Sequence, residues 1–242
     1  MKLDILAFAA HPDDIELSCS GTLLKHIEMG KKIGIVDLTK GELGTRGTAA
    51  IRAQEAEAAS KMMGIEARDN LDLGDGSFTH SMENILKIIN RIRKYQPEIV
   101  LANALSDRHP DHGRAAKLVS DACFYAGLQK IETEDNGEKQ EKWRPKVIYH
   151  YIQDHNLKPD FVVDITDYID KKMEVILAFR SQFYLPEAKE YQQELQTPIS
   201  GKQFFDFLKS KAATYGRPAG MDYAEGFNVS RTIGVKNLFE LY

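Results

Sequence analysis

The feature that most constrains this chain is a buried-strand pattern that passes directly into a helical pattern. The apolar run of residues 5–10 is short enough to form one buried strand. Helical spacing of apolar residues follows it, at Ile15, Leu23, Leu24 and Ile27. His11, Asp13 and Asp14 stand at the junction. Because ligands of open α/β sheets bind beyond the carboxyl ends of the strands, this junction is predicted to form part of a ligand site.

A second group of acidic and imidazole side chains follows another predicted strand. Residues 107–112 read Asp-Arg-His-Pro-Asp-His and come shortly after the apolar run Ile99–Ala102. Taken alone, either group is typical of an ordinary polar turn. Two such groups, both at strand ends and far apart in the chain, indicate one composite site.

Strands and helices alternate along the chain, which favours a parallel sheet covered on both faces. The predicted strands are residues 3–10, 33–38, 71–73, 99–102, 147–151 and 161–164. The predicted helices end near Met29 or span about residues 50–63, 81–95, 113–126, 166 or 167–179, and 203–215. We therefore predict an α/β fold, a Rossmann-like doubly wound and mostly parallel sheet, in a single domain over residues 1–242. A strand order of 3-2-1-4-5 makes the two polar groups face one another across the switch-point crevice.

Composition excludes several classes of partner. A net charge of -4 and a pI near 6.0 give no electrostatic reason to expect nucleic acid. No apolar run approaches the roughly 18 residues that span a bilayer, and the N-terminal run is too short for a signal peptide. Cys19 and Cys123 fall in helical patterns and are expected to be core residues rather than a disulfide, so we expect a cytoplasmic protein. The polar segment Glu132–Lys142 is expected to be a solvated surface excursion.

The two groups contain the residue types of a catalytic metal site. Catalytic zinc has three protein ligands from His and carboxylate and leaves one position for water. His11 and Asp14 can converge at the strand-to-helix turn, and His112 fits better than His109 as third ligand because it lies at the start of a helix. Asp13 is left free to take a proton from water, whose pKa zinc lowers to about 7.

His109 is then available for a second role. A neighbouring carboxylate raises the pKa of a histidine, so Asp111 is expected to hold His109 in its charged form. A protonated imidazole can stabilise a tetrahedral oxyanion, and loss of one such donor costs on the order of 100- to 1,000-fold in rate. These parts together suit hydrolysis of an amide or ester.

Two other classes of function fit the same residues. Two histidines and a carboxylate also describe the facial triad of ferrous oxygenases, although the predicted α/β fold counts against a β-barrel scaffold. A metal-holding protein without catalysis is the third alternative, and it leaves Asp13 and His109 without a role.

The two groups resemble a known pair of motifs. Residues 10–16, Ala-His-Pro-Asp-Asp-Ile-Glu, and 109–112, His-Pro-Asp-His, resemble the signatures of the PIG-L/LmbE-like zinc deacetylases. The resemblance extends to the Ile-Arg-x-x-Glu pattern of residues 51–55, to Tyr-Ala-Glu-Gly-Phe at 223–227 and to Ile-Gly-Val at 233–235. Together with the length, it is closest to the bacillithiol-pathway branch, which removes acetyl from N-acetylglucosaminyl-malate.

The resemblance implies a role for ten residues and a cofactor. By it, the metal ligands are His11, Asp14 and His112; the base is Asp13; and the oxyanion partner is His109, oriented by Asp111. The substrate-binding residues it implies are Arg52 and Asp75 near the sugar, Arg108 near the malate carboxylates, and Tyr151. The implied metal is Zn²⁺, and Fe²⁺ or Co²⁺ suit the same ligands. The implied partner is a small glycoside, with a homo-oligomer, hexameric in relatives, as the expected assembly. A general N-acetylglucosamine or chito-oligosaccharide deacetylase is the alternative within the family.

Overall fold

The computed structural model describes residues 1–185, 187–188, 191 and 193–240. In this part of the chain, seven strands form one sheet in the order β3-β2-β1-β4-β7-β9-β8. The strands are β1 (Ile5–Ala9), β2 (Ile33–Asp37), β3 (Ala67–Asn70), β4 (Ile99–Ala102), β7 (Val147–Tyr151), β8 (Phe161–Asp164) and β9 (Ala224–Val229). The first five in chain order pair in parallel, and β9 runs antiparallel to β7 and β8. The predicted mostly parallel α/β sheet is confirmed.

Strand β1 lies next to β4, as the predicted strand order requires. Ile5 pairs with Ile99 across this ladder, and β2 flanks β1 on the other side. All five residues of β1 are buried, which explains their continuous apolar run, since a central parallel strand is covered on both faces. The polar groups that follow β1 and β4 therefore emerge side by side at one edge of the sheet.

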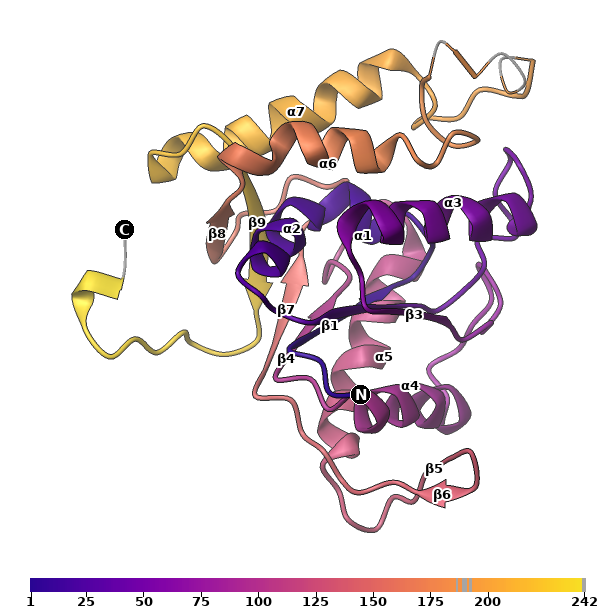
Figure 1. Ribbon diagram of the computed structural model, residues 1–242, viewed down its shortest axis with the longest axis vertical. Coiled ribbons are helices and arrows are strands. Elements are labelled where there is room, and N and C mark those ends of the chain that lie inside the picture. The colour runs from indigo at the N-terminus through magenta and orange to yellow at the C-terminus, as the bar shows by residue number, and fades with distance from the viewer. Residues whose placement is uncertain (186, 189–190, 192, 241–242) are drawn as a thin grey trace.

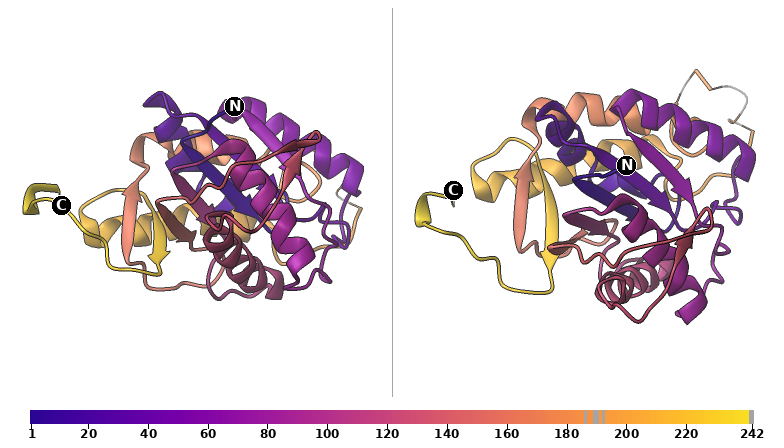
Figure 2. Two further views of the ribbon diagram at one scale, coloured as in Figure 1. Left: turned by 90° about the horizontal axis from the view of Figure 1, so that it is seen from below. Right: turned by 60° about the horizontal axis from the view of Figure 1, so that its bottom comes forward.

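Helices cover both faces of the sheet (Figure 1). One face packs against α4 (Met82–Tyr95) and α5 (Pro110–Ala126). The other packs against α1 (Asp14–Ser18), α2 (Ser20–Glu28), α3 (Ala49–Met63) and α6 (Ile169–Ile176). Helix α7 (Lys202–Gly216) packs on β9 and is followed by η3 (Arg217–Ala219). After β9 the chain runs away from the body of the molecule to η4 (Leu238–Glu240), as Figures 1 and 2 show.

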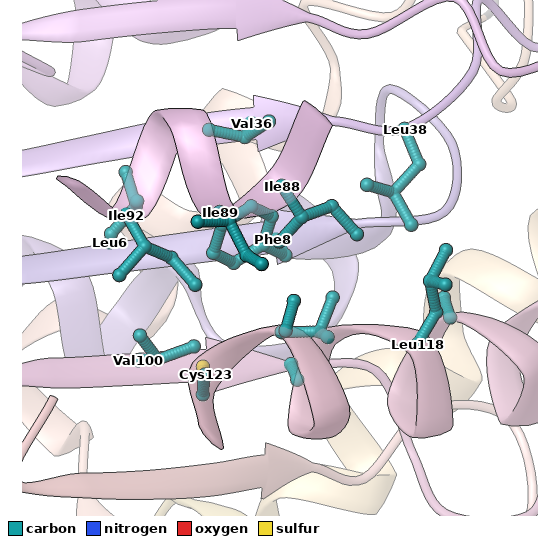
Figure 3. Packing of buried hydrophobic residues seen from close by; sticks show 14 of the residues in the cluster. Leu6, Phe8, Val36, Leu38, Ile88, Ile89, Ile92, Val100, Leu118 and Cys123 are labelled. Atoms are coloured by element: carbon teal, nitrogen blue, oxygen red, sulfur yellow. The ribbon is translucent and has the colours of Figure 1, made fainter. Parts of the chain in front are cut away.

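Alternate residues of β1 point into two hydrophobic cores, one on each face of the sheet. Leu6 and Phe8 point toward α4 and α5, whereas Ile5, Ala7 and Ala9 face α1, α2 and α3. Figure 3 shows the first core, where the two β1 residues meet Val36, Leu38, Ile88, Ile89, Ile92, Val100, Leu118 and Cys123. This alternation is the two-residue period of a strand buried on both sides.

The third strand does not lie where the sequence predicts it. It spans Ala67–Asn70 rather than residues 71–73, and Asp72 has a φ of 50°, which ends the extended backbone. The strand was missed because it is polar. Arg68 of this strand forms ion pairs with Glu16 at 2.6 Å and Asp37 at 2.8 Å. These charges, rather than an apolar run, hold the strand in the sheet.

The first helical segment is two helices instead of one. The break falls at Cys19, which has a φ of -141°. It leaves backbone N–H groups of α2 without helical acceptors, and the buried carboxylate of Glu225 accepts those of Gly21 at 3.0 Å and Thr22 at 2.7 Å. Lys172 of α6 neutralises this carboxylate at 2.6 Å. A residue more than 200 positions away thus stabilises the break.

The predicted helix from Thr166 or Asp167 through Phe179 is shorter than expected. A 3-10 turn, η1 (Thr166–Tyr168), precedes α6, which ends at Ile176. Thr166 does not cap the helix, because its hydroxyl donates to Asp164 at 2.6 Å. By contrast, Ser81 caps α4 as the pattern indicates, accepting from the backbone of Asn84 at 3.3 Å.

The polar segment Glu132–Lys142 contains a small antiparallel hairpin. Strands β5 (Glu134–Asp135) and β6 (Glu138–Lys139) are joined by Asn136 and Gly137, both with positive φ, which is the geometry that Asn-Gly favours. Elsewhere, Cys19 and Cys123 are buried free thiols. Among the described residues, no helix is both long and apolar enough to cross a membrane.

Replacing Arg68 by methionine should destabilise the protein strongly. The change leaves Glu16 and Asp37 buried without their cation, and breaking a buried pair in this way costs about 3–5 kcal/mol in free energy of unfolding. Lys61→Met, which removes the exposed pair with Glu57, is the control and should change the free energy of unfolding little, because water screens that pair. Urea unfolding measures both, and equal losses in the two variants would contradict the role given to Arg68.

Candidate active site

A cavity of about 250 Å³ opens at the carboxyl ends of β1, β4 and β7 and is walled by α7. Its lining includes residues of both polar groups, and also Arg52 and Asp75 from the part of the chain between those groups. The predicted site residues that line it are His11, Asp13, Asp14, Arg52, Asp75, Arg108, His109 and His112. Segments that lie far apart in the sequence therefore meet in one cavity.

Three imidazole rings lie against one another in this cavity. The ring centroids of His11 and His109 are 4.6 Å apart, those of His109 and His112 5.2 Å, and those of His11 and His112 5.5 Å. The carboxylate of Asp14 contacts two of them, at 3.2 Å from Nε2 of His112 and 3.7 Å from Nδ1 of His11.

Two sets of side chains offer three ligand atoms within 4.8 Å of one another in the described part of the chain. They are His11, His109 and His112, and His11, Asp75 and Asp111. The predicted set of His11, Asp14 and His112 is not one of these, although Asp14 contacts both of its histidines. His11 is common to all, so a metal site is possible around it and the ligand set stays a prediction.

The charges around the histidines favour a cation. Burial alone would lower the pKa of His11, but hydrogen bonds to Asp111 and Asp75 and the charge of Asp14 raise it to about 10. Burial likewise disfavours charge on His112, and Asp14 and Asp107 raise its pKa to about 9. Buried carboxylates thus stabilise positive charge at both rings. Imidazole and carboxylate are also the ligands of catalytic divalent metals, so the residues present fit such an ion.

Asp13 has an unusual backbone and an unusual pKa. Its φ of 121° is rare for a residue with a side chain and marks a strained turn of the kind found at functional sites. Burial raises the pKa of Asp13 to about 7, against the opposing charge of Arg52, whose Nη2 lies 3.9 Å from Oδ2. A carboxylate with a pKa near neutrality is well matched to act as a general base.

Amide side chains that sequence reasoning missed hold Asp14 in place. Asn103 donates to Oδ2 at 2.9 Å and Gln153 donates to Oδ1 at 3.0 Å, while the backbone N–H of His11 donates to Oδ2 at 3.0 Å. Asn103 follows β4 directly and Gln153 follows β7 after one residue. The rule that located the two polar groups, a polar residue just after a buried strand, could have found both.

The carboxylate of Asp107 orients the imidazole ring of His112. Its carboxylate accepts from Nδ1 of His112 at 2.5 Å and from the backbone N–H of His155 at 2.7 Å. With the proton on Nδ1, Nε2 is left as the ring atom that can bind a metal, the arrangement seen in carboxylate–histidine–metal sites. The sequence contained this signal as the first residue of the second polar group.

The structure corrects the expected relation between Asp111 and His109. The carboxylate of Asp111 accepts from the backbone of Gly76 at 2.8 Å and from Arg114 at 2.5 Å, and its contact with a histidine is to His11 at 3.4 Å. Its backbone N–H donates to Nδ1 of His109 at 3.3 Å. Burial and the charges of His11 and His112 lower the pKa of His109, so Asp111 orients the ring without holding it charged.

Tyr151, expected to bind substrate, is a core residue. It is fully buried in a hydrophobic core of the sheet, and its hydroxyl donates to the backbone oxygen of Phe8 at 2.8 Å. The expectation was wrong because Tyr151 is the last residue of β7 and points into the sheet packing, whereas the residues beyond the strand line the cavity.

The predicted substrate-binding arginines lie in the cavity with different partners. Arg52, on α3, contacts Asp13 and hydrogen-bonds Gln182. A Cβ on Gly41, in the loop before α3, would lie 2.3 Å from its guanidinium, so that loop packs directly on it. Arg108 is half-exposed at the opening and pairs with Asp154 at 2.8 Å.

Comparison with known proteins identifies the family. Residues 6–123 match the PIG-L family model, whose description is GlcNAc-PI de-N-acetylase. The crystal structure of the conserved protein TT1542 from Thermus thermophilus is 35% identical, covers 97% of this chain and 98% of that one, and superposes with a TM-score of 0.84. The chain belongs to the PIG-L family. The resemblance predicted from residues 10–16 and 109–112 is confirmed.

Curated relatives of this chain include deacetylases. Diacetylchitobiose deacetylase of Thermococcus kodakarensis is 28% identical over 92% of this chain and 81% of its own length. Probable N-acetyl-alpha-D-glucosaminyl L-malate deacetylase 2 of Bacillus anthracis is 24% identical over 74% of this chain and 81% of its own length. The description of the family model and the names of both relatives therefore point to removal of an acetyl group.

Replacing His112 by alanine should weaken metal binding. Loss of a partner that merely orients a ligand lowers metal affinity about 10- to 100-fold, so loss of the ligand itself should exceed about 100-fold. Competition with a chelator measures the affinity for Zn²⁺. His80→Ala, which removes an exposed imidazole paired with Asp121, is the control and should bind as the parent does. Unchanged affinity in the His112 variant would remove it from the ligand set.

Asp13→Asn should stabilise the metal-free protein in a pH-dependent manner. The folded protein binds the Asp13 proton up to about pH 7, whereas the unfolded chain releases it near pH 4. Ionisation therefore costs folding free energy that grows across this window and is complete above it. After chelator treatment, the variant should gain about 1–4 kcal/mol over the parent near pH 8 and little near pH 4.5, measured by urea unfolding.

Asp170→Asn is the control for this pH effect. Asp170 is largely exposed and pairs with Lys209, so its removal should change stability little at either pH. A gain for Asp13→Asn that is the same at both pH values would show that relief of a buried charge is not its cause.

Proposed function

We propose that this chain removes the N-acetyl group of a small N-acetylglucosaminide by hydrolysis. The observation that carries the proposal is the position of Asp13, a buried carboxylate that lines the cavity together with His11, Asp14 and His112. The relatives named as deacetylases support the same reaction class.

The metal that we propose is Zn²⁺, held by His11, Asp14 and His112. A divalent ion bound there supplies Lewis acidity, which lowers the pKa of a water to about 7 and polarises the amide carbonyl. The same ligands suit Fe²⁺ or Co²⁺. Membership of a deacetylase family favours hydrolysis over the ferrous oxygenase alternative, and the placement of Asp13 favours catalysis over mere metal storage.

Asp13 moves the proton in both halves of the reaction. Its carboxylate takes a proton from water as the water oxygen bonds to the amide carbon. The resulting tetrahedral centre then breaks its carbon–nitrogen bond, and Asp13 returns the proton to the departing nitrogen. The products are acetic acid and the free amine of the sugar, and transfer of one proton between them leaves acetate and the sugar ammonium, so that atoms and charge balance over the cycle.

The hydrogen-bond donor that we propose for the developing oxyanion is His109, which lines the same cavity. Its Nδ1 accepts from the backbone N–H of Asp111, so in the neutral ring the proton is on Nε2. A neutral imidazole with this proton can still donate, and the lowered pKa of His109 is therefore compatible with the role.

The substrate that we propose first is N-acetylglucosaminyl-malate. Its support is the Bacillus anthracis relative and the presence of Arg108 in the cavity lining, since the fork of an arginine suits malate carboxylates. Diacetylchitobiose or another neutral chito-oligosaccharide is the second candidate, supported by the Thermococcus kodakarensis relative and by the aromatic side chains Phe204 and Phe207 in the lining.

Asp13→Asn should abolish turnover while metal stays bound. The variant keeps the shape of the side chain but cannot accept a proton, and general-base catalysis contributes about 100- to 10,000-fold. Acetate release from N-acetylglucosaminyl-malate, N-acetylglucosamine and diacetylchitobiose, with metal content measured in parallel, tests this. Asp170→Asn is the control and should keep parental rates. Near-parental turnover by the Asp13 variant would refute the mechanism, and absence of acetate from all three substrates with the parent would refute the proposed function.

A further inference from the structure

Lys211 of α7 is a partly buried cation that the chemistry above does not use. It lines the cavity, with its Nζ 5.8 Å from the ring centres of both Phe207 and Tyr215. Its hydrogen bonds go to the backbone oxygens of Asp154 at 3.4 Å and His155 at 3.5 Å, which are long for a charged donor.

Its neighbours on the same helix are paired differently. Lys202 pairs with Asp206 at 2.5 Å and Lys209 with Asp170 at 2.9 Å, both on the surface. Among the described residues, Lys211 forms no ion pair with a carboxylate. Burial lowers its pKa to about 8, although Asp107 and Asp154 oppose the shift. Lys211 is thus an incompletely compensated charge, and such a charge gains most from an anion that enters its surroundings.

Lys211 is also close to the hydrolytic centre. Lys211 contacts the carbonyl oxygen of Asp154, and Asp154 directly follows Gln153. The amide nitrogen of Gln153 donates to Asp14 and lies 3.3 Å from Nε2 of His112. The carboxylate of Asp154 is already engaged by Arg108, so the charge of that arginine is partly neutralised. The rings of Phe207 and Tyr215 lie beside the Lys211 ammonium, and apolar surroundings strengthen an ion pair formed there.

We propose that Lys211 binds a carboxylate on the aglycone of the substrate and thereby selects anionic over neutral glycosides. The proposal rests on the proposed function and names the substrate class for the same cavity. A carboxylate entering beside Asp154 would replace two long carbonyl contacts with charge-assisted hydrogen bonds, which are about twice as strong. A neutral second sugar offers no such gain.

Lys211→Met tests this assignment, because methionine keeps the packing against the rings and removes only the charge. We expect KM for N-acetylglucosaminyl-malate to rise at least about 10-fold with kcat within about twofold, and KM for diacetylchitobiose to stay unchanged. Lys211→Arg should restore most of the affinity. Lys209→Met, which removes a surface cation of the same helix, is the control and should leave both KM values unchanged.

A binding measurement separates this inference from the reaction itself. Calorimetric titration of N-acetylglucosaminyl-malate into Asp13→Asn protein should show about 10-fold tighter binding than into the Asp13→Asn, Lys211→Met double variant, and high salt should reduce the difference. Equal affinities of the two proteins would overturn the role of Lys211 and leave the deacetylase proposal standing. A difference in binding without acetate release by the parent would uphold Lys211 as an anion-binding residue and refute the proposed reaction.

Discussion

The carboxylate of Asp14 joins the ends of three parallel strands, and the rest of the site depends on it. It begins α1 after β1, and it is held by Asn103 after β4 and Gln153 after β7. Because both oxygens are engaged, the carboxylate cannot rotate without breaking a buried hydrogen bond, which costs about 1–3 kcal/mol for the group left unpaired. The relative positions of His11 and His112 are fixed through the same carboxylate.

This rigidity places several negative charges where water cannot solvate them well. Burial raises the pKa of Asp13, and carboxylates raise the pKa values of His11 and His112, so in the protein alone the site holds protons that the unfolded chain would release. A divalent cation would remove the need for those protons. The buried carboxylates of the site thus favour a positive charge that the side chains of the site supply only in part.

The sequence was informative at the carboxyl ends of β1 and β4. The apolar runs of β1 and β4 marked both strand ends, and their adjacency followed from the expected strand order, so His11, Asp14 and His112 could be placed together before the structure was known. Elements fixed by charge were not predictable in this way. Arg68 in β3 and Glu225 at the break before α2 depend on partners distant in sequence. Tyr151 was misplaced because the direction of a side chain at the end of a strand depends on packing.

Arg46, in the loop before α3, holds the main chain of the segment that follows α6. Arg46 donates to the backbone oxygens of Ser181 at 2.8 Å, Tyr191 at 2.9 Å and Leu195 at 3.4 Å. Every residue type carries a carbonyl oxygen, so these three bonds set no requirement on the side chains of the residues that accept them. Divergence among relatives, or deliberate redesign, can therefore change the side chains of Ser181, Tyr191 and Leu195 while Arg46 still holds their backbone.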